Sequence, residues 1–329
     1  MDERIPKGLR RVLPWVPIAM LPLLRILAAL LLLAPAPSCE RRRIAALQVA
    51  TNVWPGYEPL YLARQLGMLE PAGVRLVEMP NSTDTLRALR GGMVGAAALT
   101  LDEALTLLQD GMDLRIVLVL DISNGADALL GGPGVNSLLE LRGRRVGVEN
   151  NAVGAYLLAR ALEHAGMRTE ELKVVPVTEN AHEEALRSAA VDAIVTFEPA
   201  RSRLIARGAK VLFDSRQLPQ EIFDVLVVQA ETLRSHPEGV AKLREAWFQA
   251  LEHLERDPED ATRRMAPREG LEPRSFRRAL QGLEFPGRDA ERRLREGGLL
   301  APARRLVEVM VRNRLLRRPV DPAQLLAAA

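Results

Sequence analysis

Short apolar runs rich in Val, Ile, Leu and Ala alternate along the chain with segments in which apolar residues recur every three or four positions. The first pattern predicts buried β-strands and the second predicts amphipathic helices. Two sets of four strands are expected, at residues 44–53, 74–79, 94–100, 114–121, 144–149, 172–177, 191–197 and 210–215. Helices are expected between them, at residues 58–69, 83–92, 102–110, 152–165, 180–189 and 199–207. This alternation is typical of an α/β protein with parallel strands.

The two sets of strands share one order of elements, which predicts two lobes. One more strand is expected at residues 223–229, and only charged helical segments such as 240–255 and 301–313 follow it. These helices need a sheet to pack on, so the chain should return to the first lobe through residues 216–231. The outgoing crossing is expected near residues 122–134, where Gly and Asn permit large dihedral changes. We expect each lobe to be a mostly parallel sheet flanked by helices, joined by a double hinge that closes around a ligand.

The N-terminal segment has a basic start followed by a long apolar stretch, which is typical of an export signal. The only cysteine, Cys39, follows small and turn-forming residues and is similar to the lipid-modified cysteine of bacterial lipoproteins. A leader cleaved elsewhere, or retained as a membrane anchor, is the alternative, and Met20 is an alternative start. The predicted divisions are a signal peptide at 1–38, the first part of lobe 1 at 39–125, lobe 2 at 126–222, and a return strand with C-terminal helices at 223–329.

The formal net charge of +3 belongs to the leader. Residues 1–38 contribute five basic and two acidic side chains, which leaves 40 of each sign in the rest of the chain. A neutral exported part gives no support to nucleic-acid binding. The four histidines fall on separate helical segments without metal-ligand spacing, so neither a metal site nor a cofactor is expected. With one cysteine, the exported part has no intramolecular disulfide.

Ligands of open α/β sheets bind beyond the carboxyl ends of strands. In the first lobe this rule selects Trp54, Tyr57, Glu58, Thr100, Asp102, Glu103, Asp121, Ser123 and Asn124. In the second lobe it selects Asn150, Asn151, Tyr156, Thr196 and Glu198, and Asp224 begins the returning strand. The aromatic residues offer a stacking surface to a small ligand, and the carboxylates offer charged acceptors. The alternative interpretation is structural: Trp54 and Tyr57 pack a loop onto the core, while Thr100, Asp102, Asn151 and Glu198 cap helices.

An ordered series of segments resembles the periplasmic substrate-binding proteins of ABC importers, in the nitrate, sulfonate, taurine and thiamine-precursor group. The series reads WPGYEPLYLARQLGML, TDTLRALRGGMVGAAALTLDEAL, VLVLDISNGADALL, LRGRRVGVENNAVGAYLLARAL, VDAIVTFEP and LFDSRQLPQEIFDVLVV, and the resemblance covers about residues 45–315. It implies a type II periplasmic-binding-protein fold, a monomer that closes around a small solute, and delivery to a membrane permease with a cytoplasmic ATPase. It also implies ligand contacts at residues 54–58, 100–103 and 150–155, and the last range includes Gly154.

The sign of the solute's charge follows from the residues at the predicted cleft. Its segments carry many carboxylates and no Lys or Arg, the acidic residues being Glu58, Asp102, Glu103, Asp121, Asp127, Glu198 and Asp224. A bare anion would meet like charge there unless helix N-termini offset it. We therefore expect a neutral or cationic nitrogenous solute, such as the thiamine pyrimidine precursor, with an anionic sulfonate, taurine or nitrate as the alternative.

An enzyme of the same fold, similar to the thiamine-pyrimidine synthase or to cytoplasmic dehydratases, is a competing class. Those chemistries need a reactive Cys and His set or a cytoplasmic address. This chain has only Cys39 next to the leader and no His at a predicted strand end, so no catalytic residue is assigned. A lipid-tethered sensor or accessory domain is a third class. The expectation is a periplasmic binding protein, tethered to the membrane by a lipid on Cys39.

Overall fold

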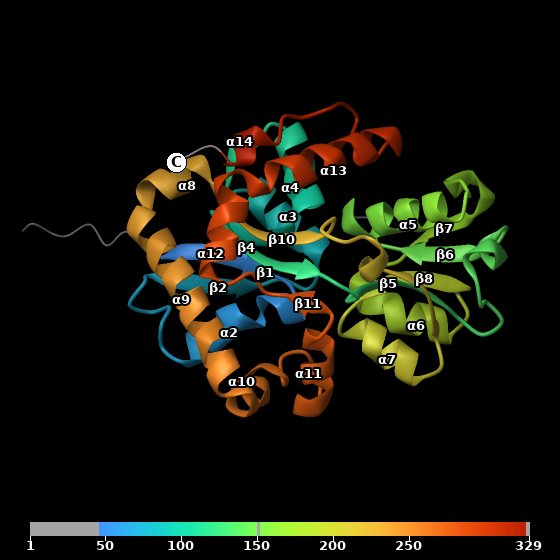
Figure 1. Ribbon diagram of the computed structural model, residues 1–329, viewed down its shortest axis with the longest axis horizontal. Helices are drawn as coiled ribbons and strands as arrows, with labels where there is room; N and C mark the ends of the chain where they lie inside the picture. The colour runs from blue at the N-terminus through green and yellow to red at the C-terminus, as the bar shows by residue number, and fades with distance from the viewer. Residues whose placement is uncertain (1–45, 150–151, 327–329) are drawn as a thin grey trace, which may run out of the picture. The chain divides into compact units, whose positions relative to one another are not determined.

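The computed structural model of the chain describes residues 46–149 and 152–326. The predicted signal peptide, the candidate lipidation site Cys39 and the predicted ligand residues Asn150 and Asn151 lie outside the described residues. Two β-sheets with helices on both faces make up the described part, and both lie in one compact unit, Ala45–Ala329 (Figure 1). We call each sheet together with its helices a lobe.

The first sheet has the strand order β11-β4-β10-β3-β1-β2. Its strands are β1 (Leu47–Thr51), β2 (Val74–Glu78), β3 (Ala96–Thr100), β4 (Leu114–Ser123), β10 (Phe223–Gln229) and β11 (Leu283–Glu284). β1 pairs in parallel with β2 and β3, while β10 lies between β3 and β4 and is antiparallel to both. The sequence-based expectation that the chain returns to the first lobe therefore has its counterpart in β10, which fills the middle of this sheet.

The second sheet has the strand order β7-β6-β8-β5-β9. Its strands are β5 (Asp127–Gly131), β6 (Arg145–Val148), β7 (Lys173–Pro176), β8 (Ala193–Phe197) and β9 (Lys210–Asp214). β6 pairs in parallel with β7 and β8, and β5 is antiparallel to β8 and β9. β5 is an interior strand that joins β9 to the rest of the sheet, and all five of its residues are buried.

Both sheets are mixed but mostly parallel: β10 and β11 run against the other strands of the first sheet, and β5 runs against the other strands of the second. The α/β class and the mostly parallel order are confirmed. The reversal of β5 and of β10 has one physical origin: the chain enters each sheet directly from the other one, without a crossover helix, at these two strands. A strand that follows such a direct crossing is free to run antiparallel, whereas a parallel neighbour needs a helical crossover of a dozen or more residues.

Helices pack on both faces of the first sheet (Figure 1). One face carries α2 (Glu58–Gln65), α9 (Pro237–Arg256), α10 (Pro258–Met265) and α11 (Pro273–Leu280), and the other carries α3 (Ser82–Arg90), α4 (Leu101–Gln109), α13 (Leu300–Arg312) and α14 (Ala323–Leu326). Shorter elements of this lobe are η2 (Pro55–Tyr57), α8 (Ala230–Ser235), α12 (Arg288–Arg293) and the π-helical turn η7 (Leu294–Gly298). Strand ends and helix starts follow one another without long loops here, so β3 runs straight into α4.

The second sheet is covered by α5 (Ala152–His164) on one face and by α6 (His182–Arg187) and α7 (Ala200–Ala206) on the other (Figure 1). Short 3-10 turns complete the connections, at η3 (Leu138–Leu141), η4 (Thr169–Glu171), η5 (Glu179–Ala181) and η6 (Ser215–Gln217). α5 also packs against α4 of the first lobe. Apolar side chains of both lobes belong to one continuous cluster there, so the lobes share part of a core.

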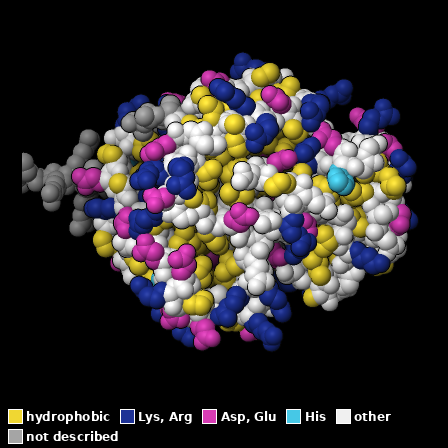
Figure 2. Space-filling model, in the orientation of Figure 1, with side chains coloured by type: hydrophobic (Ala, Val, Ile, Leu, Met, Phe, Trp, Pro, Cys, Tyr) yellow, Lys and Arg dark blue, Asp and Glu magenta, His cyan; other side chains and the backbone are white. Residues whose placement is uncertain are grey.

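Two chain segments connect the sheets, residues 124–126 between β4 and β5 and residues 215–222 between β9 and β10. They are tied to each other by Ser215, whose Oγ lies 2.7 Å from the Oγ of Ser123 and accepts the N–H of Gly125 at 2.6 Å. In the ranges that the structure describes, no helix is long and apolar enough to cross a membrane. Acidic and basic side chains are interspersed over the face in Figure 2, as expected from the balanced charge of residues 39–329.

Candidate functional site

A cavity lies between the two sheets, with a volume of about 330 Å³ that includes the part open to solvent. Its walls come from both lobes, and the lining residues are Asn52, Trp54, Tyr57, Ser82, Thr100, Glu103, Asp127, Val153, Phe197 and Asp224. β1, β3 and β8 end at the cavity, and the antiparallel β5 and β10 begin there. The cavity therefore lies at the strand edge that the sequence rule selected.

Five residues that the strand-end rule selected line the cavity: Trp54, Tyr57, Thr100, Glu103 and Asp224. Asp127, which the sequence placed next to the cleft, lines it as well. The other predicted residues that the structure describes lie outside the lining; Asn124 among them donates to Glu284 Oε1 at 2.7 Å, and the rest are described below. The role of the lining residues in binding stays a prediction.

Two aspartates lie on neighbouring strands at the cavity, and one of them, Asp224, lines it. Asp224 on β10 is the direct cross-strand partner of Asp121 on β4 and, on its other side, of Thr100 on β3. The hydroxyl of Tyr57 donates to Asp224 Oδ1 at 2.5 Å, and Trp54 Nε1 donates to Asp121 Oδ2 at 3.2 Å. The carboxylates thereby hold both aromatic rings at the cavity. Asp121 itself is a support behind Trp54 and does not line the cavity.

Position 56 requires glycine for a steric reason. A Cβ atom on residue 56 would lie 2.0 Å from Asp121 Oδ2 and 2.4 Å from Trp54 Nε1. No side chain fits between these two groups, because real Cβ contacts are never that short. The Pro55-Gly56-Tyr57 turn can bring the Trp54 and Tyr57 side chains over the two aspartates only with glycine in the middle.

The cavity is strongly acidic. Burial, together with the neighbouring Asp121, raises the pKa of Asp224 well above its usual range. Burial raises the pKa of Asp121 to about 8 and that of Asp127 to about 6, and it also raises the pKa of Glu103. Among the described residues that line the cavity, none is Lys or Arg. The raised pKa values favour protonated carboxyls in the ligand-free protein, and N–H groups or a positive charge brought by a solute would favour their ionised, hydrogen-bond-accepting form.

An aromatic contact closes the other side of the cavity across the two lobes. The ring of Trp54 meets the ring of Phe197 edge to face, with centroids 6.0 Å apart and planes at 77°. Behind Phe197 lies His182, whose ring centroid is 5.8 Å from that of Phe197 and whose Nδ1 is 3.1 Å from Thr196 Oγ1. Burial lowers the pKa of His182 to about 4, so this histidine is neutral. The predicted ligand residue Thr196 thus contacts His182 and is not among the lining residues.

Glu58 does not face the cavity, which corrects the sequence-based expectation of a free acceptor. Its side chain is fully buried, and its Oε1 accepts Arg268 Nη1 at 2.5 Å. Arg268 also lies over the ring of Tyr61, 3.6 Å from the centroid. The partner is 210 residues away along the chain, in a segment that the strand-end rule did not select. Glu58 is therefore part of an internal ion pair below the first lobe's loop.

Glu198, Ser123 and Asp102 also lie outside the lining. Glu198 accepts Arg201 Nη1 at 3.0 Å and Ser202 Oγ at 2.8 Å at the start of α7, which agrees with the helix-capping interpretation. Ser123 belongs to the hinge contact with Ser215. Asp102 is buried in the first turn of α4, where burial and the adjacent Glu103 raise its pKa to about 8. Gly154, the residue implied by the resemblance, is in the first turn of α5.

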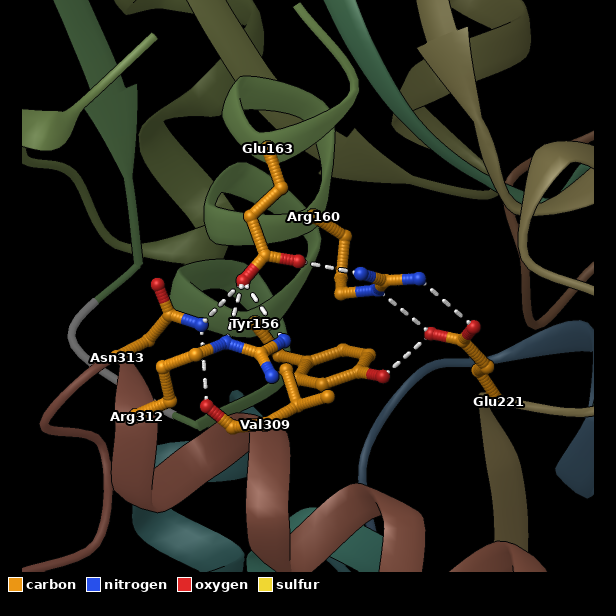
Figure 3. Close-up of polar contacts among 7 residues, drawn as sticks. All are labelled: Tyr156, Arg160, Glu163, Glu221, Val309, Arg312 and Asn313. Atoms are coloured by element: carbon orange, nitrogen blue, oxygen red, sulfur yellow. Dashed lines mark hydrogen bonds and ion pairs between the residues drawn. The ribbon is translucent and has the colours of Figure 1, made fainter. Parts of the chain in front are cut away.

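Tyr156 is not among the lining residues of the cavity, and its side chain belongs to a polar network between α5 and two other segments (Figure 3). Its hydroxyl donates to Glu221 Oε2 at 2.5 Å, and Arg160 donates to both oxygens of Glu221 at 2.8 and 3.0 Å. On the next turn of α5, Glu163 Oε1 accepts Arg312 Nη2 at 3.0 Å and Asn313 Nδ2 at 2.9 Å. The network ties the second lobe to the returning segment and to the end of α13.

Three lining residues were not selected from the sequence: Asn52, Ser82 and Phe197, whereas Val153 lies in the range 150–155 that the resemblance implied. Ser82 begins α3, just after β2, and extending the strand-end rule to that strand would have found it. Phe197 ends β8 and was counted as part of the strand core, although its neighbour Glu198 was selected. In the part of the chain that the structure describes, no group of three His, Cys, Asp or Glu side chains is placed to hold a metal ion.

A model described as the NMT1-like family matches residues 42–267, which is more than half of the chain. The chain belongs to the NMT1-like family. A comparison of this NMT1-like protein with curated proteins found no match.

Solved structures share the fold of the NMT1-like protein at low sequence identity. One is the alkanesulfonate-binding protein SsuA from Xanthomonas axonopodis pv. citri bound to MOPS, with 20% identity, a TM-score of 0.74, and coverage of 85% of this chain and 97% of that chain. A second is the Candida albicans CA3427 gene product, described as having the generic periplasmic binding protein fold, with 14% identity, a TM-score of 0.68, and coverage of 85% and 94%. A third is the desulfurization enzyme DszB, with 19% identity, a TM-score of 0.60, and coverage of 84% and 95%. The fold is that of the periplasmic binding proteins.

Proposed function

We propose that this NMT1-like protein is an extracytoplasmic solute-binding protein that closes around a small solute and delivers it to an ABC importer. The fold and the family support this proposal. So does the position of the cavity, which takes residues from both lobes and lies beside two connecting segments that are bonded to each other. In this proposal residues 39–125 and 223–329 form the first lobe, residues 126–222 form the second, and a lipid on Cys39 tethers the monomeric protein to the membrane.

The solute that fits the cavity best is a neutral or cationic nitrogenous compound. The observation that carries this proposal is the lining itself, in which Glu103, Asp127 and Asp224 have no Lys or Arg beside them among the described lining residues. The Asp127 Oδ2 atom is buried without a hydrogen-bond partner in the described structure. N–H groups of the solute would donate to these oxygens, and charge-assisted hydrogen bonds of this kind are roughly twice as strong as neutral ones.

A flat ring suits the remaining walls. Trp54 and Phe197 face the cavity from opposite lobes, and Tyr57 lies beside Asp224. A heterocycle in the cavity would bury one face against this aromatic surface while its amino groups reach the carboxylates. The thiamine pyrimidine precursor, an aminopyrimidine, has both features. Micromolar affinity corresponds to about 8 kcal/mol, which one aromatic contact and a few charge-assisted hydrogen bonds can supply in a closed cavity.

An anionic sulfonate is the second candidate. It is favoured by the likeness to SsuA, which is described as bound to MOPS, and by Ser82, which brings the N-terminus of α3 to the cavity. Helix N-termini stabilise anions. The acidic lining opposes this candidate, because an anion would have to approach Glu103, Asp127 and Asp224.

A titration calorimetry panel at pH 7 tests the proposal. One arm contains the thiamine pyrimidine precursor and primary alkylamines, and the other contains taurine, methanesulfonate and nitrate. We expect binding in the first arm and a loss of affinity of about 2–5 kcal/mol on Asp224→Asn, which removes a carboxyl that a bound N–H donor or cation would hold in its ionised form. The matched control is Asp289→Asn, whose exposed side chain pairs only with Arg292 among the described residues. Binding of sulfonates without any response to the amines would refute the charge argument.

A further inference from the structure

The N-terminus of α3 faces the second lobe across the cavity. A helix start has four backbone N–H groups that its own turns cannot satisfy. In α3 the N–H of Asp84 donates to Asn81 Oδ1 at 2.8 Å, and the N–H of Thr85 makes the first bond of the helix itself, to the Asn81 carbonyl at 3.1 Å. The N–H groups of Ser82 and Thr83 come before these, at the very start of the helix. Ser82 lines the cavity.

Glu149, at the end of β6 in the second lobe, reaches this helix start. Its Oε1 accepts the hydroxyl of Thr83 at 3.0 Å, and the side chain is almost completely buried. Burial raises the pKa of Glu149 to about 7, although the hydroxyl and the backbone amide of Thr83 both act in the opposite direction. Its second oxygen, Oε2, is buried without a hydrogen-bond partner in the described structure. The carboxylate thus occupies the place that a helix N-terminus offers to an anion.

A second carboxylate of the second lobe, that of Glu179 in η5, lies at the same helix start. Burial and the nearby Glu149 raise the pKa of Glu179 to about 8, while the backbone amide of Ser82 and the side-chain amide of Asn52 lower it. Ser82 and Asn52 both line the cavity. The second lobe therefore brings two carboxylates against the α3 end of the cavity.

Two carboxylates at the N-terminus of α3 leave no favourable position there for an anionic solute. An anion at this end would have to displace Glu149 from Thr83 and would remain next to Glu179, and like charges in a poorly solvated space repel strongly. A neutral or cationic solute meets no such conflict. The helix start also gains charge compensation from the protein itself, since carboxylates near a helix N-terminus are stabilising.

We propose that Glu149 and Glu179 are specificity-determining residues, which occupy the anion position at the start of α3 when the lobes are together and thereby exclude anionic solutes. This inference rests on the proposed binding function and adds the means by which the protein rejects one class of solute. Neither residue needs to touch the accepted solute for this role.

The test is a gain of anion binding. The double variant Glu149→Gln/Glu179→Gln keeps the side-chain size and removes both ionisable carboxyls, and methanesulfonate is the probe in titration calorimetry at pH 9, where both carboxyls of the unchanged protein are ionised. We expect the variant to bind methanesulfonate at least roughly tenfold more tightly than the unchanged protein does. The control Glu170→Gln/Glu184→Gln removes two exposed charges from the same lobe and should leave methanesulfonate binding unchanged. Thermal melts establish that both variants fold, and Glu149→Gln alone, with a smaller gain, replaces the double variant if that one does not fold.

Each result separates the two proposals. A folded double variant that gains no methanesulfonate affinity overturns the role of Glu149 and Glu179 and leaves the binding function standing. An equal gain in the control overturns the role too, because it would reflect net charge alone. Tight methanesulfonate binding by the unchanged protein overturns both this inference and the proposed nitrogenous solute.

Discussion

Asp127→Asn should make the ligand-free protein more stable at alkaline pH while it weakens solute binding. Asp127 begins β5 and lines the cavity from the second lobe, and its Oδ2 has no hydrogen-bond partner in the described structure. Burial is the main cause that raises its pKa from 3.8 to about 6; Glu198 and Glu103 add to this, while Ser123 and Arg201 oppose it. A carboxyl with a raised pKa is costly to ionise in the folded protein, and asparagine never ionises.

The magnitude follows from the pKa difference between the folded protein and the unfolded chain. The neutral acid is favourable below pH 3.8, and this stability is lost as the pH rises through about 6. A difference of about 2 pKa units corresponds to about 3 kcal/mol at pH 8, to about 1.5 kcal/mol at pH 5, and to almost nothing near pH 3.5. The variant should therefore gain stability over the unchanged protein with increasing pH, and the gain should level off above about pH 7.

Urea denaturation of both ligand-free proteins between pH 4 and 8 measures this gain as a difference in the free energy of unfolding. The control Asp289→Asn changes an exposed carboxylate and should show no comparable pH dependence. Parallel stability curves for Asp127→Asn and the unchanged protein would refute the reasoning, since they would mean that Asp127 ionises as easily in the folded protein as in water. In the presence of an aminopyrimidine or amine that binds, the order should reverse, because the variant has lost an acceptor for the bound solute.

Three further perturbations address the aromatic wall and the contacts between the lobes. Trp54→Ala should weaken solute binding by about 1–3 kcal/mol through lost aromatic contact, measured by calorimetry, with thermal melts of the ligand-free variant to measure the accompanying loss of core packing. Gly56→Ala should cost about 1–3 kcal/mol of stability, because its Cβ would collide with Asp121; unchanged urea midpoints would contradict the steric argument. Glu163→Gln should speed solute release a few-fold in stopped-flow measurements, since it weakens a half-exposed link between α5 and α13 worth up to about 1 kcal/mol; an unchanged release rate would show that the link is retained on opening. Small-angle scattering should also show a smaller radius of gyration with saturating solute than without it.

The strands could largely be predicted because their apolar runs are continuous and bounded by turn residues. Even β10, which completes the first sheet from a distant part of the chain, begins at the predicted residue 223. β5 was assigned to the hinge instead, since the Gly and Asn residues on both sides of the segment DALLG suggested turns. Burial of such a short segment on both faces depends on the sheet around it, and a single sequence does not reveal that environment.

The candidate site was predicted where it depends on strand ends and missed where it depends on pairing. Trp54, Tyr57, Thr100 and Asp224 line the cavity because strands of one sheet end or begin along a common edge. The pairing of Glu58 with Arg268 could not be predicted, since the two residues are 210 positions apart and nothing local identifies the partner. A count of charges near the cleft therefore overestimates the carboxylates that a solute can reach.

The central position of β10 has a consequence for how the chain acquires its structure. β10 separates β3 from β4, and it pairs with both. Until residue 229 has been synthesised, β3 and β4 lack the strand that lies between them. Residues 127–214, in contrast, already contain every strand of the second sheet. In terms of domain organisation the second sheet is an insertion into the first. The second sheet can form while the polypeptide is still growing. The host domain, in which Asp121 on β4 pairs with Asp224 on β10, forms only after the inserted residues have been synthesised.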